Sequence, residues 1–176
     1  MSLPVLLATD RLVFRAFGEE DLDDLIRFHT DTDVQTGYDV HGATWSREEI
    51  AARLSAYISD QAKHGFSRWK LSLRNGEFIG RAGLGWHEFG RSVELGYGLL
   101  PAYWGRGFAQ EAAAALIRWG FEHLRIETIV AFTYRGNKRS SKALAATGMK
   151  HVDDRARSVK DGVCAYYEIK RSEAGF

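Results

Sequence analysis

The chain has 176 residues, of which 45% are hydrophobic and 27% are charged, and its 24 lysines and arginines nearly balance 23 acidic residues. These proportions are those of one globular domain that buries its own core, and they exclude a disordered or fibrous protein. The net charge of +1 gives no general attraction to nucleic acid or to an anionic membrane, and the single cysteine, Cys164, cannot form an internal disulfide.

The ends of the sequence and its hydropathy bear on location. It contains neither an apolar run long enough to cross a membrane nor a charged-then-apolar leader. We therefore expect a cytoplasmic protein, monomeric or homodimeric, that binds neither nucleic acid nor membrane. One domain is expected over residues 1–176, with its ordered core at about 9–171.

The first part of the chain predicts one strand followed by helices. Residues 9–15 alternate apolar and polar side chains, which indicates a strand. Residues 18–29 gather acidic side chains at the front of a helical apolar spacing. The polar stretch 31–41 indicates a loop or a broken helix. Ser46 and Glu49 then form a capping box for a helix that continues to about His64.

The rest of the chain alternates strands and helices. Residues 66–74 and 78–87 flank Asn75-Gly76, the strongest hairpin signal in the sequence, so they are expected to pair in antiparallel fashion. Further strands are predicted at 92–100, 127–134, 150–157 and 163–171, the last two joined by Lys160-Asp161-Gly162, and helices from 109 and at 137–147, ended by Gly148. This order predicts an α+β fold with a mixed, mostly antiparallel sheet of about seven strands and about four helices.

The stretch from Glu94 to Gly120 contains a strand, a turn and an alanine-rich helix. Gly105 and Gly107 lie at the join, where the unpaired N–H groups of the helix begin. Such a turn suits a phosphate group. The same glycines would also serve an ordinary tight turn, and the residues alone leave both interpretations open.

Taken in order, these segments give the sequence a family resemblance. It resembles the GNAT acyltransferase superfamily, and within it the Rim-type branch that contains ribosomal-protein N-terminal acetyltransferases. The matching stretches are TDRLVFR at 9–15, Ile79-Gly80, ELGYGLLPAYWGRGFAQEA from Glu94, and Asn137-x-x-Ser140 with Leu144 and Gly148-Met149. They stand in family order and span roughly residues 9–170.

The resemblance implies transfer of acetyl from acetyl-CoA to a primary amine, on a protein N-terminus or a small molecule, by direct attack. The glycine turn would wrap the pyrophosphate, and pantetheine would lie where the strand at 94–100 splays from the strand near 128–134. Since Trp104 stands where the superfamily often has glutamine or arginine, Arg106 is the nearest expected cation. The residues implied for the cofactor are Tyr97, Leu99, Leu100, Trp104, Gly105, Arg106, Gly107, Phe108, Ala109, Asn137 and Ser140.

Two side chains are candidates for proton transfer. Glu94 matches the position of the general base in histone-type relatives, but it is equally consistent with a carboxylate paired with an arginine. Ser140 is the candidate acid for the leaving thiolate, because Ala145 follows Leu144 where many relatives have a tyrosine. Ser140 could instead satisfy a helix N-terminus, for which Asn137 is the better cap. The oxyanion donor is expected to be a main-chain N–H of Tyr97 or a neighbour.

The acceptor side is less defined. Aromatic residues at such positions are more often core than ligand contacts. The candidate pocket residues are Tyr38, Trp45, Phe66, Trp69, Trp86, Tyr134 and Tyr167. The basic cluster Lys138, Arg139 and Lys142 could meet the ribose phosphate or face solvent. No metal is expected, since no ligand spacing exists. The alternative function is a non-catalytic acyl-CoA sensor or interaction module on the same fold.

Overall fold

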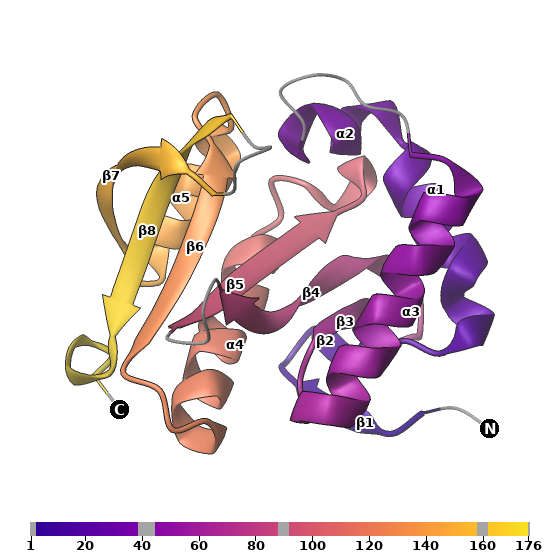
Figure 1. Ribbon diagram of the computed structural model, residues 1–176, viewed down its shortest axis with the longest axis horizontal. Coiled ribbons are helices and arrows are strands. Elements are labelled where there is room, and N and C mark those ends of the chain that lie inside the picture. The colour runs from indigo at the N-terminus through magenta and orange to yellow at the C-terminus, as the bar shows by residue number, and fades with distance from the viewer. Residues whose placement is uncertain (1–2, 39–44, 88–91, 158–161, 176) are drawn as a thin grey trace.

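The computed structural model describes residues 3–38, 45–87, 92–157 and 162–175. Eight strands form one sheet in the order β1-β2-β3-β4-β5-β6-β8-β7 (Figure 1). The strands are β1 Val5–Ala8, β2 Leu12–Arg15, β3 Arg68–Leu73, β4 Phe78–His87, β5 Ser92–Leu99, β6 Thr128–Tyr134, β7 Lys150–Ala156 and β8 Val163–Lys170. The α-helices in the described residues are α1 Leu22–Thr30, α2 Thr32–Tyr38, α3 Arg47–His64, α4 Phe108–His123 and α5 Lys138–Ala146.

The predicted α+β fold with a mixed sheet is confirmed, and the structure adds one strand and one helix. The added strand, β1, pairs with β2 at the edge of the sheet. Its four residues are half-buried or exposed, so they carry little of the alternation that marks a strand. The added helix, α2, falls in the stretch expected to be a loop or broken helix. Asp31 starts it, because one side-chain oxygen accepts hydrogen bonds from the main-chain N–H groups of Asp33 and Val34, both at 3.0 Å.

Local signals placed the other elements well. Gly76 has φ 88° between β3 and β4, which pair in antiparallel register as the Asn-Gly turn predicts. Ser46 accepts from the Glu49 N–H and Glu49 reaches back to the Ser46 N–H, so the capping box of α3 is confirmed. The strands β7 and β8 also pair as expected, while Lys160 and Asp161 of their predicted turn lie outside the described residues.

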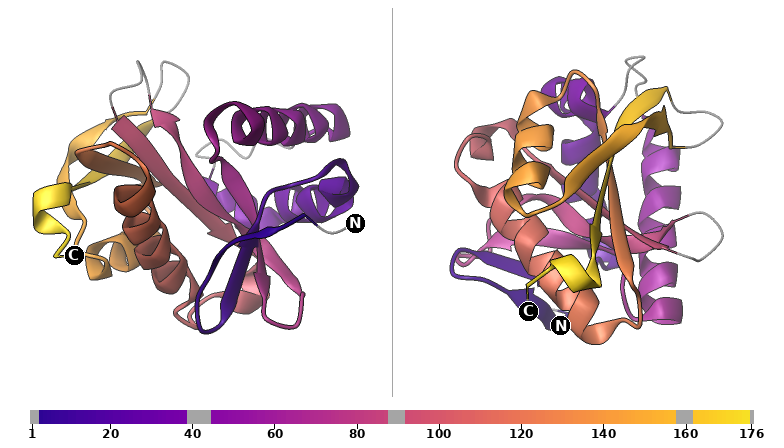
Figure 2. Two further views of the ribbon diagram at one scale, coloured as in Figure 1. Left: turned by 90° about the horizontal axis from the view of Figure 1, so that it is seen from below. Right: turned by 90° about the vertical axis from the view of Figure 1, so that its left-hand side faces the viewer.

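The helices cover both faces of the sheet, α3 on one and α4 on the other (Figure 2). The α4 face is closed by fully buried side chains of α4, β4 and β5, including Leu84, Leu95 and Leu116. The α3 face is partly polar, because Arg15, Lys70 and Arg81 occupy opposed positions on adjacent strands β2, β3 and β4. In the described part of the chain, no helix combines the length and the apolar character needed to span a membrane.

The sheet opens in its middle. Strand β5 pairs with β4 along its whole length, from Ser92 opposite His87 to Leu99 opposite Gly80. Its parallel pairing with β6 covers only three residues and ends at Leu95 opposite Ala131. Beyond that point β5 and β6 diverge (Figure 1), and β6 continues along β8 alone. The splay expected for this sheet is therefore confirmed, and one edge of residues 96–99 has no strand partner among the residues that the structure describes.

Candidate active site

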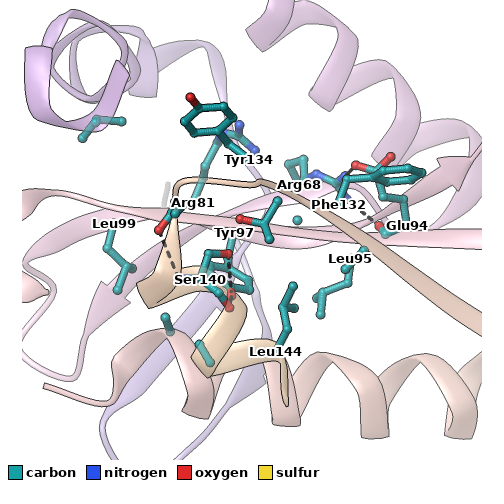
Figure 3. Close-up of a pocket in the computed structure, with 18 of the residues that line it drawn as sticks. Arg68, Arg81, Glu94, Leu95, Tyr97, Leu99, Phe132, Tyr134, Ser140 and Leu144 are labelled. Carbon is teal, nitrogen blue, oxygen red and sulfur yellow. Dashed lines mark hydrogen bonds and ion pairs between the residues drawn. The ribbon is translucent and has the colours of Figure 1, made fainter. Parts of the chain in front are cut away.

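A cleft of about 990 Å³ occupies the splay (Figure 3). Its walls come from α3, from the strands β3 to β6, from the turn after β5, and from α5. Residues from the middle of β5, including Gly96, Tyr97 and Gly98, line its floor. The strand edge, the glycine turn and the asparagine-serine helix thus open onto one space, as the sequence pattern required.

The glycine turn has the geometry of a main-chain anion site. Gly105 and Gly107 have φ of 70° and 80°, left-handed conformations that other residues adopt at a cost. Gly107 is the N-cap of α4, and no described side chain caps it. The first N–H groups of α4 therefore lack intrahelical partners, and Gly107, Phe108 and Ala109 line the cleft. The turn fits a phosphate group.

The cleft near this turn is lined by the cation Arg139, whereas the sequence suggested Arg106. The Arg106 guanidinium lies 5.2 Å from the Phe108 ring centroid, and Arg106 is not among the described residues that line the cleft. Arg139 does line it, stacked 3.7 Å from the centroid of the Trp104 ring. Trp104 is itself fixed by a 2.8 Å hydrogen bond from its indole N–H to the carbonyl of Leu99. The tryptophan therefore holds an arginine from α5 over the turn.

Other residues predicted for the cofactor divide in two. Asn137, Leu99 and Ala109 line the cleft, and so does Lys142 of the basic cluster whose role the sequence left open. Leu100, although buried, lies outside the lining.

Ser140 and Tyr97 meet on the α5 side of the cleft. The Tyr97 hydroxyl lies 3.1 Å from both the carbonyl oxygen and the Oγ of Ser140, as Figure 3 shows. Asn137 caps α5 by accepting a 3.1 Å hydrogen bond from the Ser140 N–H. Because the cap uses the main chain of Ser140, the Ser140 hydroxyl is not needed for it and stays directed at Tyr97 and the cleft.

Glu94 is a buried, ion-paired carboxylate. Its Oε1 accepts a 3.0 Å hydrogen bond from Arg68 and its Oε2 a 2.9 Å hydrogen bond from Arg157, while His87 Nδ1 lies 3.6 Å from Oε2. Burial alone would raise the pKa of Glu94, but His87, Arg68 and Arg157 lower it from 4.5 to about 2. The geometry is that of the arginine-paired carboxylate, one of the two alternatives that the sequence left open.

Glycines on the neighbouring strands leave room for the Arg68 guanidinium to contact Glu94. A Cβ on Gly96 would lie 2.9 Å from three guanidinium atoms of Arg68. Arg68 also donates to the carbonyls of Gly83 and Glu94 at 2.9 and 2.8 Å. The absence of side chains at Gly83 and Gly96 therefore lets Arg68 lie buried against these strands.

The aromatic candidates are also split. Trp45, Phe66, Trp86 and Tyr134 line the cleft. Trp69 is 1% exposed and its ring centroid lies 4.9 Å from that of Trp119. Tyr167 is buried, packs against His151 with the two rings tilted, and is not in the cleft lining, so Trp69 and Tyr167 belong to the core or its edge. The side chain of Tyr38 lies outside what the structure describes.

Sequence reasoning missed a polar wall opposite the turn. His29 of α1, Arg53 and Tyr57 of α3, and Arg81 of β4 all line the cleft. Burial and the charges of Arg81 and Arg53 lower the pKa of His29 to about 3, so its imidazole is neutral. The available signal was Arg81, a cation inside an otherwise apolar strand; Arg53 and Tyr57 carried none beyond helical spacing.

Known proteins share this fold and this sequence pattern. An acetyltransferase structure from Agrobacterium tumefaciens str. C58 superposes with a TM-score of 0.81 at 26% identity, over 97% of this chain and 96% of that one. The structure of Mycobacterium smegmatis RimJ in complex with CoA-disulfide superposes with a TM-score of 0.78 at 20% identity, over 94% and 84%. The fold is that of an acetyltransferase.

The sequence comparisons fix the family. A model described as an acetyltransferase (GNAT) domain matches residues 11–150. The Bacillus subtilis (strain 168) protein YoaA, named an uncharacterized N-acetyltransferase, is 26% identical over 166 residues, covering 92% of this chain and 87% of YoaA. The chain belongs to the GNAT acetyltransferase family and is an N-acetyltransferase, so the alternative of a non-catalytic module is set aside.

Proposed function

We propose that this enzyme transfers acetyl from acetyl-CoA to a primary amine by direct attack within a ternary complex. The observation that carries the proposal is the shared cleft: the uncapped start of α4, the unpaired edge of residues 96–99 and the Ser140 hydroxyl all face it. RimJ, which shares the fold, was solved with a CoA disulfide.

The residues fit each part of acetyl-CoA. The pyrophosphate would take the main-chain N–H groups of Gly107 to Ala109, with Arg139 and Lys142 as cations. The amides of pantetheine suit the open edge of β5, as an added strand would. We place the thioester beside Tyr97, where the strands part.

The proton steps follow from the same geometry. The neutral amine nitrogen forms a bond to the thioester carbonyl carbon, the C–S bond breaks, the nitrogen releases its extra proton to water in the cleft, and the sulfur receives a proton from the Ser140 hydroxyl. Tyr97, 3.1 Å from Ser140 Oγ, passes a proton from that water back to Ser140, so both hydroxyls end the cycle protonated. The asparagine-serine helix that supports this role is the feature shared with the Rim-type branch, in which we place the chain on mechanistic grounds.

We assign Glu94 a positioning role. A carboxylate with pKa about 2 is a poor acceptor for an ammonium proton, since an α-amine titrates near ~8 and the gap of ~6 pH units costs ~8 kcal/mol. An amine of that kind is substantially neutral at pH ~7.5 and needs little base. Glu94 instead holds Arg68 and Arg157 at the mouth of the splay and can orient a water beside the amine.

The proposal is tested by calorimetry with coenzyme A and by thiol release with a panel of amines. Gly107→Glu puts a carboxylate at the phosphate turn and should abolish coenzyme binding. Gly76→Glu is the matched control, because Gly76 also has a left-handed φ, 88°, and open space around it but lies in the β3–β4 hairpin. Equal binding by both variants would remove the phosphate assignment.

A further inference from the structure

The part of the cleft between α3 and the sheet carries an excess of positive charge. The described residues lining that part include four cationic side chains, those of Arg53, Arg68, Arg81 and Arg157, and two carboxylates, those of Asp60 and Glu94. The cations therefore outnumber the carboxylates by two. The excess matters because Arg81 is only 6% exposed and Arg68 is similarly enclosed, so water screens them weakly.

Neighbouring carboxylates are already engaged elsewhere. Glu94 is shared by Arg68 and Arg157. Further along the same face, Asp21 and Asp24 hold Lys70 at 2.7 and 2.6 Å, and Asp21 also pairs with Arg15. Glu49, in the first turn of α3, accepts a hydrogen bond from the main-chain N–H of Ser46. Of the two described carboxylates that line this part of the cleft, only Asp60 is left to face Arg53 and Arg81, so the region of these two arginines keeps a net positive charge.

Arg53 and Arg81 converge on Tyr57. The Arg53 guanidinium stacks 4.1 Å from the Trp45 ring centroid, and the Arg81 guanidinium lies 5.9 Å from the Tyr57 ring centroid. Burial raises the pKa of Tyr57, but the charges of Arg81, Arg53 and Arg68 outweigh it and the pKa lies below its usual value. The lowered pKa of Tyr57 is thus a sign of the positive charge of the surrounding arginines.

His29 gives an independent indication of a ligand. Its side chain lines the same wall, is 4% exposed, and its Nε2 has no hydrogen-bond partner among the described residues. The ring centroids of His29 and Trp45 lie 5.6 Å apart, and Gln35 links the two residues by donating to the His29 carbonyl and accepting from the Trp45 indole N–H. A buried polar atom that has no partner among the described residues, on a residue that lines a cleft, is suited to a hydrogen bond with a ligand.

We propose that the acceptor is a small primary amine that also carries an oxyanion, a carboxylate or a phosphate, which binds between Arg53 and Arg81 with His29 as a further hydrogen-bond partner. The inference rests on the proposed function and narrows its substrate class. Arginine is suited to planar oxyanions because its guanidinium offers two parallel N–H donors. Polycationic acceptors would meet repulsion at the same wall.

The test compares matched acceptors in the thiol-release assay. L-alanine is paired with L-alaninamide, O-phosphoethanolamine with ethanolamine, and spermidine represents the polycations. The comparison is stringent, since the ammonium group of the amide loses its proton more readily than that of the amino acid. The wild type should prefer the oxyanion-bearing member of at least one pair by roughly 10- to 100-fold in kcat/KM. The pair that shows the preference identifies the anion.

Variants tie the preference to the arginines. Arg53→Gln and Arg81→Gln should lose it through a higher KM for the acceptor, with the KM for acetyl-CoA unchanged, and Arg53→Lys should retain part of it. Arg47→Gln is the control, because Arg47 lies on the same helix with its side chain 63% exposed. Arg53 is only half-buried, so Arg53→Gln is expected to fold. The test can therefore still be decided if Arg81→Gln does not fold.

A melting assay separates failure of the inference from failure of the proposed function. Turnover that favours neither L-alanine over L-alaninamide nor O-phosphoethanolamine over ethanolamine, or that favours spermidine, overturns the inference and leaves the acetyltransferase proposal intact. If no amine is acetylated, a rise in melting temperature with L-alanine or O-phosphoethanolamine that is lost in Arg53→Gln supports the anion site and counts against the assigned chemistry. Absence of both turnover and a melting shift overturns both.

Discussion

Replacing Glu94 by glutamine tests whether its carboxylate is held ionised by its partners. The change keeps the size of the side chain but removes the charge that Arg68 and Arg157 contact at 3.0 and 2.9 Å. The fall in pKa from 4.5 to about 2 corresponds to about 3 kcal/mol of stability. Because the folded pKa lies below the unfolded one, this stability is complete above pH 4.5 and is lost as the pH falls toward 2.

Urea unfolding followed by circular dichroism measures the difference between wild type and Glu94→Gln. We expect a gap of about 3 kcal/mol at pH 6 that narrows to about 1 kcal/mol at pH 3, since part of the wild-type advantage is then lost. Glu122→Gln, an exposed position on α4, controls for removal of a glutamate. A gap that stays constant between the two pH values would refute the argument.

The kinetics of the same variant address its role. If Glu94 only positions its neighbours, the acidic limb of the pH profile of kcat/KM stays in place in Glu94→Gln. If Glu94 accepts the amine proton, that limb follows its titration and disappears in the variant.

Three further predictions concern other contacts. Tyr97→Phe should lower kcat about tenfold, at nearly unchanged KM for acetyl-CoA, because Ser140 Oγ loses its 3.1 Å partner; steady-state kinetics that show no change would exclude the relay. Trp104→Ala should weaken coenzyme A binding about tenfold in calorimetry, since the support under Arg139 is lost. Lys70→Met should destabilise the fold by about 3 kcal/mol in denaturant titrations, because it removes a cation held 2.7 Å from buried Asp21; a loss below 1 kcal/mol would contradict this.

The elements predicted from the sequence are those set by local chemistry. The Asn75-Gly76 turn, the Ser46 capping box and the Gly148 stop each depend on a few adjacent residues. The glycine turn for which we propose phosphate binding is also local, since two glycines precede a helix start. These features could be found without knowing which strands are neighbours.

The polar wall depends on strand order and register. Arg68, Arg81 and Glu94 come together because β3, β4 and β5 pair in one register, with Gly83 opposite both Arg68 and Gly96. Arg157 reaches Glu94 from 63 residues away. No periodicity reveals such contacts. Arg81 was the one visible sign, since a cation in an apolar strand requires a reason for its burial.

The walls of the cleft come from different parts of the chain. The residues of the proposed anion site, His29 of α1, Arg53 of α3 and Arg81 of β4, all precede residue 82, whereas the glycine turn, α4 and α5 follow residue 100. Sequence drift in the earlier segments can therefore redirect the choice of acceptor while the later segments stay under constraint. Exchange of α3 between homologues offers a direct route to altered selectivity.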